Sequence, residues 1–148
     1  MRPVESTIEI AAEPAEVWAV LVDFAAYPEW ASFIDRIEGH AEPESRIGVH
    51  LTPTQGKPIH VKPTVVDVQP NRRLAWAMAV GHRALFHGEH SFELTPSSRG
   101  THLVQKEVFR GAIAAVIRNS PRGALESFAA FNESLKQRVE RGASPAGS

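Results

Sequence analysis

The sequence of 148 residues contains no cysteine. This absence excludes a disulfide framework, a thiolate zinc site and a thiol nucleophile. A chain of this length falls in the size range of one domain and buries about 70% of its unfolded surface, so it can form a core without such cross-links. We expect a single domain over residues 1–141. The small, breaker-rich residues 142–148 predict a disordered tail.

An excess of charge of one sign is also missing. The chain has 16 Lys and Arg against 17 Asp and Glu, which gives a formal net charge of −1. This balance provides no long-range positive field, so we expect no nucleic-acid partner. No stretch approaches the ~18 consecutive apolar residues of a membrane helix, and the N-terminus lacks the apolar run of a signal peptide. We expect a cytoplasmic protein without a membrane span.

Proline and glycine are frequent, with 11 and 10 residues, and they divide the middle of the chain into short elements. Apolar alternation predicts strands at residues 6–11, 34–38, 47–52 and 59–68. Pro63 places part of the last of these at an edge or a bulge. Three longer strands are expected to follow in antiparallel order over 74–80, 86–94 and 103–109.

Helical spacing of apolar residues occurs near both ends of the chain. Pro14 is suited to the first position of a helix, and apolar residues continue at helical spacing to Phe24. A short second helix is expected through Trp30 and Phe33, and another near residues 113–117. The last helix follows Gly123 and carries an apolar seam at spacings of 3, 4, 3 and 4, formed by Leu125, Phe128, Asn132, Leu135 and Val139.

This order of elements predicts an α+β fold. A strongly curved antiparallel sheet of about seven strands must cover its apolar face, and the C-terminal helix is the element long enough to do so. A sheet wrapped around one helix in this way leaves space for a ligand between the two layers.

The sequence resembles the START-domain and birch-pollen-allergen superfamily, and within it the bacterial polyketide cyclase/dehydrase-like proteins of the SRPBCC group. The resemblance covers about residues 4–140. The matching segments are Ala-Glu-Pro-Ala-Glu-Val-Trp at 12–18, Asp-Phe-Ala-Ala-Tyr-Pro-Glu-Trp at 23–30, 70–76, 88–94, 100–101 and 107–111. It implies a helix-grip fold with a hydrophobic cavity, in which relatives bind, carry or transform lipids, sterols, polyketides or other aromatic molecules.

His90 and Glu107 are the candidate polar pair of that cavity. Both occupy strand faces that are otherwise apolar, and if Leu94 pairs with Leu103 across the turn, His90 lies opposite Glu107. The pair could anchor a ligand hydroxyl or carbonyl, or act as a catalytic acid and base. A purely structural pair inside the sheet is the alternative. Further candidate lining residues are Trp30, Phe33, Trp76, Met78, Phe86, Phe92, Gln105, Phe109, Phe128, Phe131, Asn132 and Leu135, although core packing alone also explains the large apolar ones.

No metal or other cofactor is expected from the sequence. His87 and His90 point to opposite faces of one strand, so they cannot share an ion. The remaining histidines are scattered, with no two four residues apart on a helix, which predicts that they are solvated; they are His40, His50, His60, His82 and His102. The same is expected of the charged groups of Arg72, Arg73, Arg83 and Arg110.

Three functions are compatible with these features. The first is the binding or transport of a small hydrophobic ligand by a monomer or homodimer, and the second is polyketide aromatase/cyclase or dehydratase activity in the same cavity. The third, a protein-interaction domain, has no exposed apolar stripe in the sequence to support it.

Overall fold

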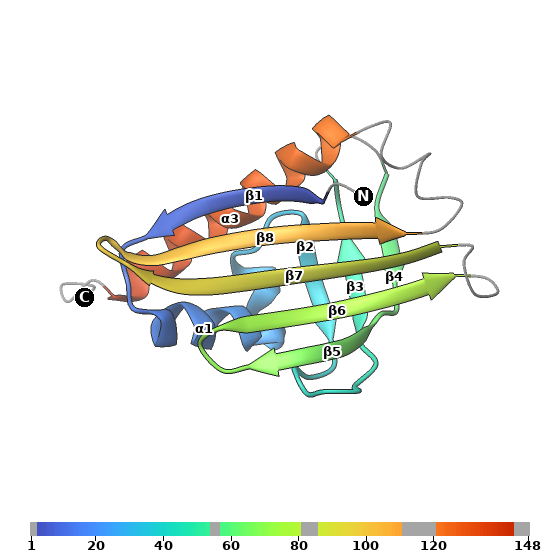
Figure 1. Ribbon diagram of the computed structural model, residues 1–148, viewed down its shortest axis with the longest axis horizontal. Helices are drawn as coiled ribbons and strands as arrows, with labels where there is room; N and C mark the ends of the chain where they lie inside the picture. The colour runs from blue at the N-terminus through green and yellow to red at the C-terminus, as the bar shows by residue number, and fades with distance from the viewer. Residues whose placement is uncertain (1–2, 54–56, 81–85, 111–120, 144–148) are drawn as a thin grey trace.

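A five-stranded antiparallel sheet forms the front layer of the protein in the computed structural model, which describes residues 3–53, 57–80, 86–110 and 121–143 (Figure 1). Its strand order is β1-β8-β7-β6-β5. Each neighbouring pair is antiparallel, and β7 and β8 form a long hairpin. The strands are β1 (Val4–Ile10), β5 (Thr64–Gln69), β6 (Arg73–Val80), β7 (Phe86–Ser97) and β8 (Gly100–Arg110).

A three-stranded sheet lies behind the first, and its strands run across those of the large sheet (Figure 1). It consists of β2 (Ile34–Glu38), β3 (Gly48–Leu51) and β4 (Ile59–Val61). We expected one strand over residues 59–68, but the chain breaks at Pro63, and its two halves belong to different sheets. Proline cannot donate to a ladder; its carbonyl accepts a hydrogen bond from the Ile47 amide at 2.9 Å, at the corner between the sheets.

The C-terminal helix α3 (Pro121–Ala143) packs along β1 behind the large sheet (Figure 1). Its apolar face is buried, and full burial of one large apolar side chain stabilises a fold by roughly 1.5–3 kcal/mol. This face consists of Phe128, Phe131, Leu135 and Val139. Leu125, which the spacing also placed in the seam, is 41% exposed, so the buried face starts almost one turn later. The helix begins at Pro121, because proline is tolerated in a first turn.

The N-terminal helices close the end of the core. α1 (Pro14–Val22) buries Val17 and Leu21, and the short 3₁₀ helix η1 (Phe24–Glu29) buries Phe24 and Tyr27. The two short helices expected after the first strand are therefore present, but the second lies earlier than predicted. η1 ends before Trp30, and Phe33 adopts a left-handed φ of 70°. The Phe33 carbonyl accepts a hydrogen bond from the Thr52 amide at 2.8 Å, which ties this irregular turn to the end of β3.

The fold is therefore the α+β helix-grip arrangement expected from the sequence, with an open sheet that holds the C-terminal helix. The described part of the chain forms eight strands in two sheets. Among these residues, no helix is both long and apolar enough to cross a membrane. Of the predicted tail, Gly142 and Ala143 are the last residues of α3, whereas 144–148 and the expected helix at 113–117 lie outside the described residues.

Candidate ligand cavity

A cavity of about 500 Å³ lies between α3, the large sheet and the three-stranded sheet. This volume is within the range of pockets that bury a small organic molecule. Among the described lining residues, His90, Glu107 and Ser127 have polar side chains, and the others are apolar or glycine. They are Phe33, Ile34, Val49, Leu51, Pro53, Ile59, Val61, Pro63, Trp76, Met78, Gly88, Phe109, Gly123, Ala124 and Phe128.

Half of the candidate residues from the sequence lie in the cavity wall. They come from the turn before β2, from the three central strands of the large sheet and from α3. These residues are Phe33, Trp76, Met78, His90, Glu107, Phe109 and Phe128. Gly88 lies between Met78 and Phe109 in the sheet, and its missing side chain leaves room above the strands.

Six other candidates lie outside the wall, in the packed core. Trp30 contacts Tyr27 and Phe131, with ring centroids 4.8 and 5.4 Å apart. Its buried Nε1 has no hydrogen-bond partner among the described residues. The remaining five are Phe92, Gln105, Phe131, Asn132 and Leu135, all buried further along the helix or sheet. The side chain of Phe86 lies outside the described part of the structure.

The three-stranded sheet supplies a wall that sequence reasoning missed. Val49 and Leu51 of β3, together with Ile59 and Val61 of β4, face the cavity. Their alternation predicted strands, but it carried no information about which element those strands cover. Ile59 is 49% exposed, so this wall reaches the rim of the cavity.

The β7–β8 hairpin places His90 directly opposite Glu107, in the register obtained by counting back from Leu94 and Leu103. His90 Nδ1 lies 2.6 Å from Glu107 Oε1, close enough that one proton must lie between them. The His90 ring stacks on Trp76 at 5.4 Å and meets the edge of Phe128 at 5.1 Å. These aromatic contacts hold the imidazole in one orientation.

A second hydrogen bond fixes the other side of the His90 ring. Gln105 Nε2 donates to Asn132 Oδ1 at 2.7 Å and to the Phe128 carbonyl at 3.2 Å. The amide oxygen of Gln105 therefore faces His90, and it lies 2.9 Å from Nε2. An amide oxygen can only accept, so His90 Nε2 must carry a hydrogen. Gln105 and Asn132 thus act on the cavity through His90 rather than by facing the cavity themselves.

Among the described lining residues, these bonds leave one carboxylate oxygen for a ligand. Both ring nitrogens of His90 are occupied, as is Oε1 of Glu107, whereas Oε2 of Glu107 has no partner among the described residues. Ser127 Oγ donates to the Gly123 carbonyl at 2.9 Å. A ligand hydroxyl or amide could donate to Glu107 Oε2, and His90 would hold the carboxyl group in place.

Arg73 corrects the expectation that the arginines near the turns are solvated. It is half-buried on the outer face of the large sheet and contacts Asp67 at 2.8 Å, Glu89 at 3.0 Å and Glu93 at 3.4 Å. The hydrogen bond from Arg73 lowers the pKa of Asp67. Arg73 thus links β5, β6 and β7. Arg72 and Arg110 are exposed, as expected, and Arg83 lies outside the described residues.

An open antiparallel sheet that grips a C-terminal helix around an apolar cavity defines the helix-grip class of ligand-cavity proteins. The sequence matches the family model described as "Polyketide cyclase / dehydrase and lipid transport" over residues 1–140. The chain belongs to this family, as its sequence motifs indicated. Comparison with curated protein sequences gave no match.

Solved structures of similar proteins share the fold over almost the whole chain. The Zhui aromatase/cyclase from a Streptomyces species has a TM-score of 0.75 and 21% identity, with 99% of this chain and 98% of that chain covered. The protein TTHA0849 from Thermus thermophilus has a TM-score of 0.75 and 16% identity, with 97% and 100% covered. MLL2253 from Mesorhizobium loti has a TM-score of 0.70 and 24% identity, with 95% and 98% covered. At these identities the likeness shows the fold alone.

Proposed function

We propose that this protein binds a small, largely apolar molecule in its cavity. A single polar group of the ligand donates a hydrogen bond to Glu107. The observation that carries the proposal is the 500 Å³ cavity with an apolar wall and one partner-free carboxylate oxygen among the described residues. Burial of an apolar ligand in such a cavity is favourable by roughly 25 cal/mol per Å² of apolar surface removed from water. Lipids, sterols and aromatic polyketides have this chemistry.

The polar end of the cavity supports an oriented ligand rather than a loosely held one. The side chain of Glu107 is 16% exposed and that of His90 is 7% exposed, so a hydrogen bond to Glu107 forms in a largely dry site. A hydrogen bond to a charged group contributes about 1.5–3 kcal/mol, which corresponds to a ~10- to 100-fold change in affinity. The apolar wall supplies affinity, and Glu107 supplies the direction of binding.

Native mass spectrometry of mildly purified protein, followed by thermal-shift measurements with a panel of fatty acids, sterols and aromatic polyketides, tests the proposal. We expect at least one panel member to raise the melting temperature. Val61→Trp should reduce or abolish this shift because the larger side chain enters the cavity and takes up part of its volume. Val66→Trp is the matched control, since Val66 is 48% exposed on β5 and is not part of the wall. A panel without any Val61→Trp-sensitive shift, together with no co-purified species, would refute ligand binding.

A second candidate function is polyketide aromatase/cyclase or dehydratase activity. The observation that favours it is the proton held between His90 Nδ1 and Glu107 Oε1 beside the cavity. In a dehydration, a carboxylate can remove a proton from the carbon next to a carbonyl, and a proton returned to the neighbouring hydroxyl lets water leave as the double bond forms. The pair holds both a basic oxygen and a transferable proton.

Turnover of a polyketide substrate by the Glu107→Gln and His90→Gln variants tests this second function. We expect both changes to reduce turnover by at least about 100-fold, the usual scale of a general acid or base. Ligand binding in the thermal-shift assay should survive His90→Gln better than turnover does. Undiminished turnover in both variants would exclude the pair from catalysis and contradict the roles assigned to His90 and Glu107.

A further inference from the structure

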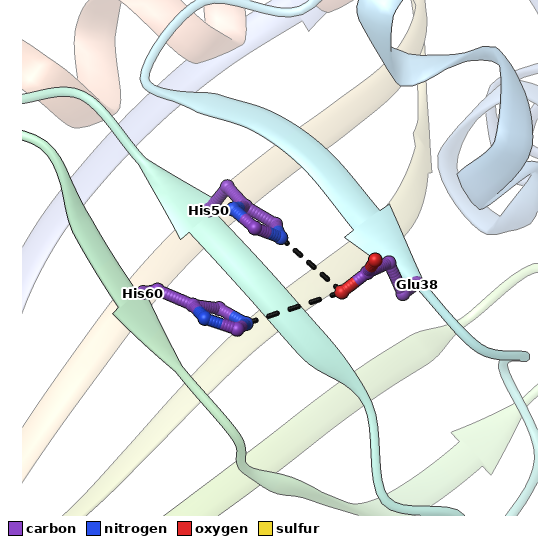
Figure 2. Close-up of side chains that lie close together, drawn as sticks. All are labelled: Glu38, His50 and His60. Carbon is purple, nitrogen blue, oxygen red and sulfur yellow. Dashed lines mark hydrogen bonds and ion pairs between the residues drawn. The ribbon is translucent and has the colours of Figure 1, made fainter.

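Two histidines and one glutamate meet on the outer face of the three-stranded sheet (Figure 2). His50 of β3 lies directly opposite His60 of β4, and Glu38 of β2 lies opposite Gly48, two residues from His50 along β3. Each strand of the sheet thus contributes one side chain to the same spot. The sequence suggested that the histidines were scattered, because the pairing of β3 with β4 brings together residues that no helical or same-strand spacing relates.

The donor atoms of the three side chains converge. His50 Nε2 lies 3.2 Å from Glu38 Oε1, and His60 Nε2 lies 3.9 Å from the same oxygen (Figure 2). The two imidazole rings are stacked, with centroids 4.1 Å apart and planes inclined by 10°, so that both Nε2 atoms face the carboxylate. One potential ligand atom from each of the three residues lies within 4.8 Å of the others.

Gly48 keeps the space between these atoms open. A Cβ at this position would lie 2.7 Å from Glu38 Oε1 and 3.2 Å from His60 Nε2. Every other residue type would therefore intrude on the place where the donor atoms meet. On the far side of the carboxylate, Arg36 Nη2 donates to Glu38 Oε2 at 3.2 Å, which turns Oε1 toward the histidines.

We propose that Glu38, His50 and His60 form a binding site for a divalent transition-metal ion, with Zn²⁺ as the expected ligand. In a tetrahedral zinc site with bonds of about 2.0–2.1 Å, neighbouring donor atoms lie roughly 3.3 Å apart. The three atoms lie within 4.8 Å of one another, so side-chain rotations that shorten these separations by up to about 1.5 Å bring them to this geometry. Two imidazole nitrogens and a carboxylate oxygen suit Zn²⁺, Cu²⁺ and Ni²⁺ better than Mg²⁺ or Ca²⁺. Three protein ligands leave the fourth position to water.

The accessibility of the site agrees with this assignment. The three side chains are 34–51% exposed, so an ion can reach them from solvent. The Arg36–Glu38 contact matches the hydrogen bonds that usually orient a ligating carboxylate.

Metal binding at this site would join all three strands of the cavity wall. The reverse face of the same strands carries Val49 and Val61, which line the cavity. An ion that binds only the folded sheet raises the stability of that sheet in proportion to the logarithm of its free concentration. The ion is therefore expected to stabilise the wall without entering the cavity.

Isothermal titration of the full chain with Zn²⁺ alone tests the proposal, in a buffer that does not bind metal and without any cavity ligand. We expect saturable binding of one ion per chain and a higher melting temperature with Zn²⁺. His60→Ala and Glu38→Gln should each weaken binding by at least about tenfold. Gly48→Ala should weaken it similarly, although it keeps all three ligands. His102→Ala, which removes an exposed histidine paired with Glu9 on the large sheet, is the matched control and should leave the affinity unchanged.

Circular dichroism of each variant shows whether it is folded, and Glu38→Gln preserves the shape of the side chain should His60→Ala fail to fold. Absence of one-to-one binding in the wild type would overturn the proposal. Equal affinity in wild type, His60→Ala and Glu38→Gln would also overturn it, because the ion would then be bound elsewhere. Neither outcome bears on the proposed cavity ligand, which is assayed without metal.

Discussion

Replacement of Gln105 by leucine should expose how much the fold depends on the polar network behind the cavity. Gln105 is fully buried and makes three hydrogen bonds, to His90, Asn132 and the Phe128 carbonyl. Leucine has a similar size and removes the amide. The Phe128 carbonyl lies within helix α3, where the backbone supplies its hydrogen bond, so it does not depend on Gln105. The groups that lose an essential partner are His90 Nε2–H and Asn132 Oδ1.

The cost follows from these two orphaned groups. A buried donor or acceptor without a partner costs about 1–3 kcal/mol, and leucine returns part of this as apolar burial. We expect Gln105→Leu to lower the free energy of unfolding by about 3 kcal/mol. With a slope of about 1–3 kcal/mol per M urea, the midpoint of denaturation should fall by about 1–3 M.

Urea denaturation followed by circular dichroism measures this effect. Gln137→Leu is the matched control, because Gln137 is exposed on α3 and its loss should change stability by less than about 0.5 kcal/mol. The double variant Gln105→Leu with Asn132→Leu should cost less than the sum of the single changes, since it leaves no orphaned Asn132 oxygen. A Gln105→Leu protein within about 1 kcal/mol of wild type would refute the hydrogen-bond network.

Three further outcomes are expected. Gly100→Ala should destabilise the protein by more than about 2 kcal/mol in thermal denaturation, because Gly100 has a φ of 133° and a Cβ would lie 2.5 Å from the Ile10 carbonyl oxygen. Gly123→Ala is the contrasting control: Gly123 has open space around it, so this change should stabilise α3 by about 0.5–1 kcal/mol. Tyr27→Phe should cost about 1 kcal/mol in urea denaturation, because it removes the 2.6 Å hydrogen bond to the Leu21 carbonyl, and no change would mean that this bond contributes nothing. The pKa of Asp67 is lowered in the folded protein, so its bond to Arg73 stabilises the protein fully above the ordinary Asp pKa of about 3.9, and this stability is lost as the pH falls through the lower folded value. Asp67→Asn should therefore remove this part of the pH dependence of the free energy of unfolding, an effect of less than about 1 kcal/mol. An unchanged dependence of the free energy of unfolding on pH in this acidic range would contradict the assignment.

The β7–β8 hairpin was readable from the sequence because a tight turn sets the register of its strands. The turn before Gly100 fixes Leu94 opposite Leu103, and the alternation then places His90 opposite Glu107. The apolar spacing of α3 and the alternation of the strands β1, β7 and β8 could be read from the sequence for the same reason, because each is a local pattern with a fixed period.

The second sheet was not readable, because no local pattern decides which strands pair across a long connection. Pro63 signalled an irregularity, but only the fold shows that it divides one apolar run between two sheets. The depth of each aromatic residue was equally hidden. Phe128 and Phe131 are neighbours on the buried face of α3, yet Phe128 lines the cavity and Phe131 packs behind it on Tyr27 and Phe92.

The pairing of β1 with β8 has a consequence for how the protein comes to be folded. Val4 pairs with Glu107, roughly a hundred positions later, and the last helix then attaches to β1 through Lys136, which donates to the Glu9 carbonyl at 2.9 Å. Contacts between such distant parts of a chain form slowly. On the ribosome, the first strand must wait without its partner until β8 has emerged, and α3 follows β8 in the chain. The cavity can therefore close only after α3 has emerged, so it is among the last of the described parts to form.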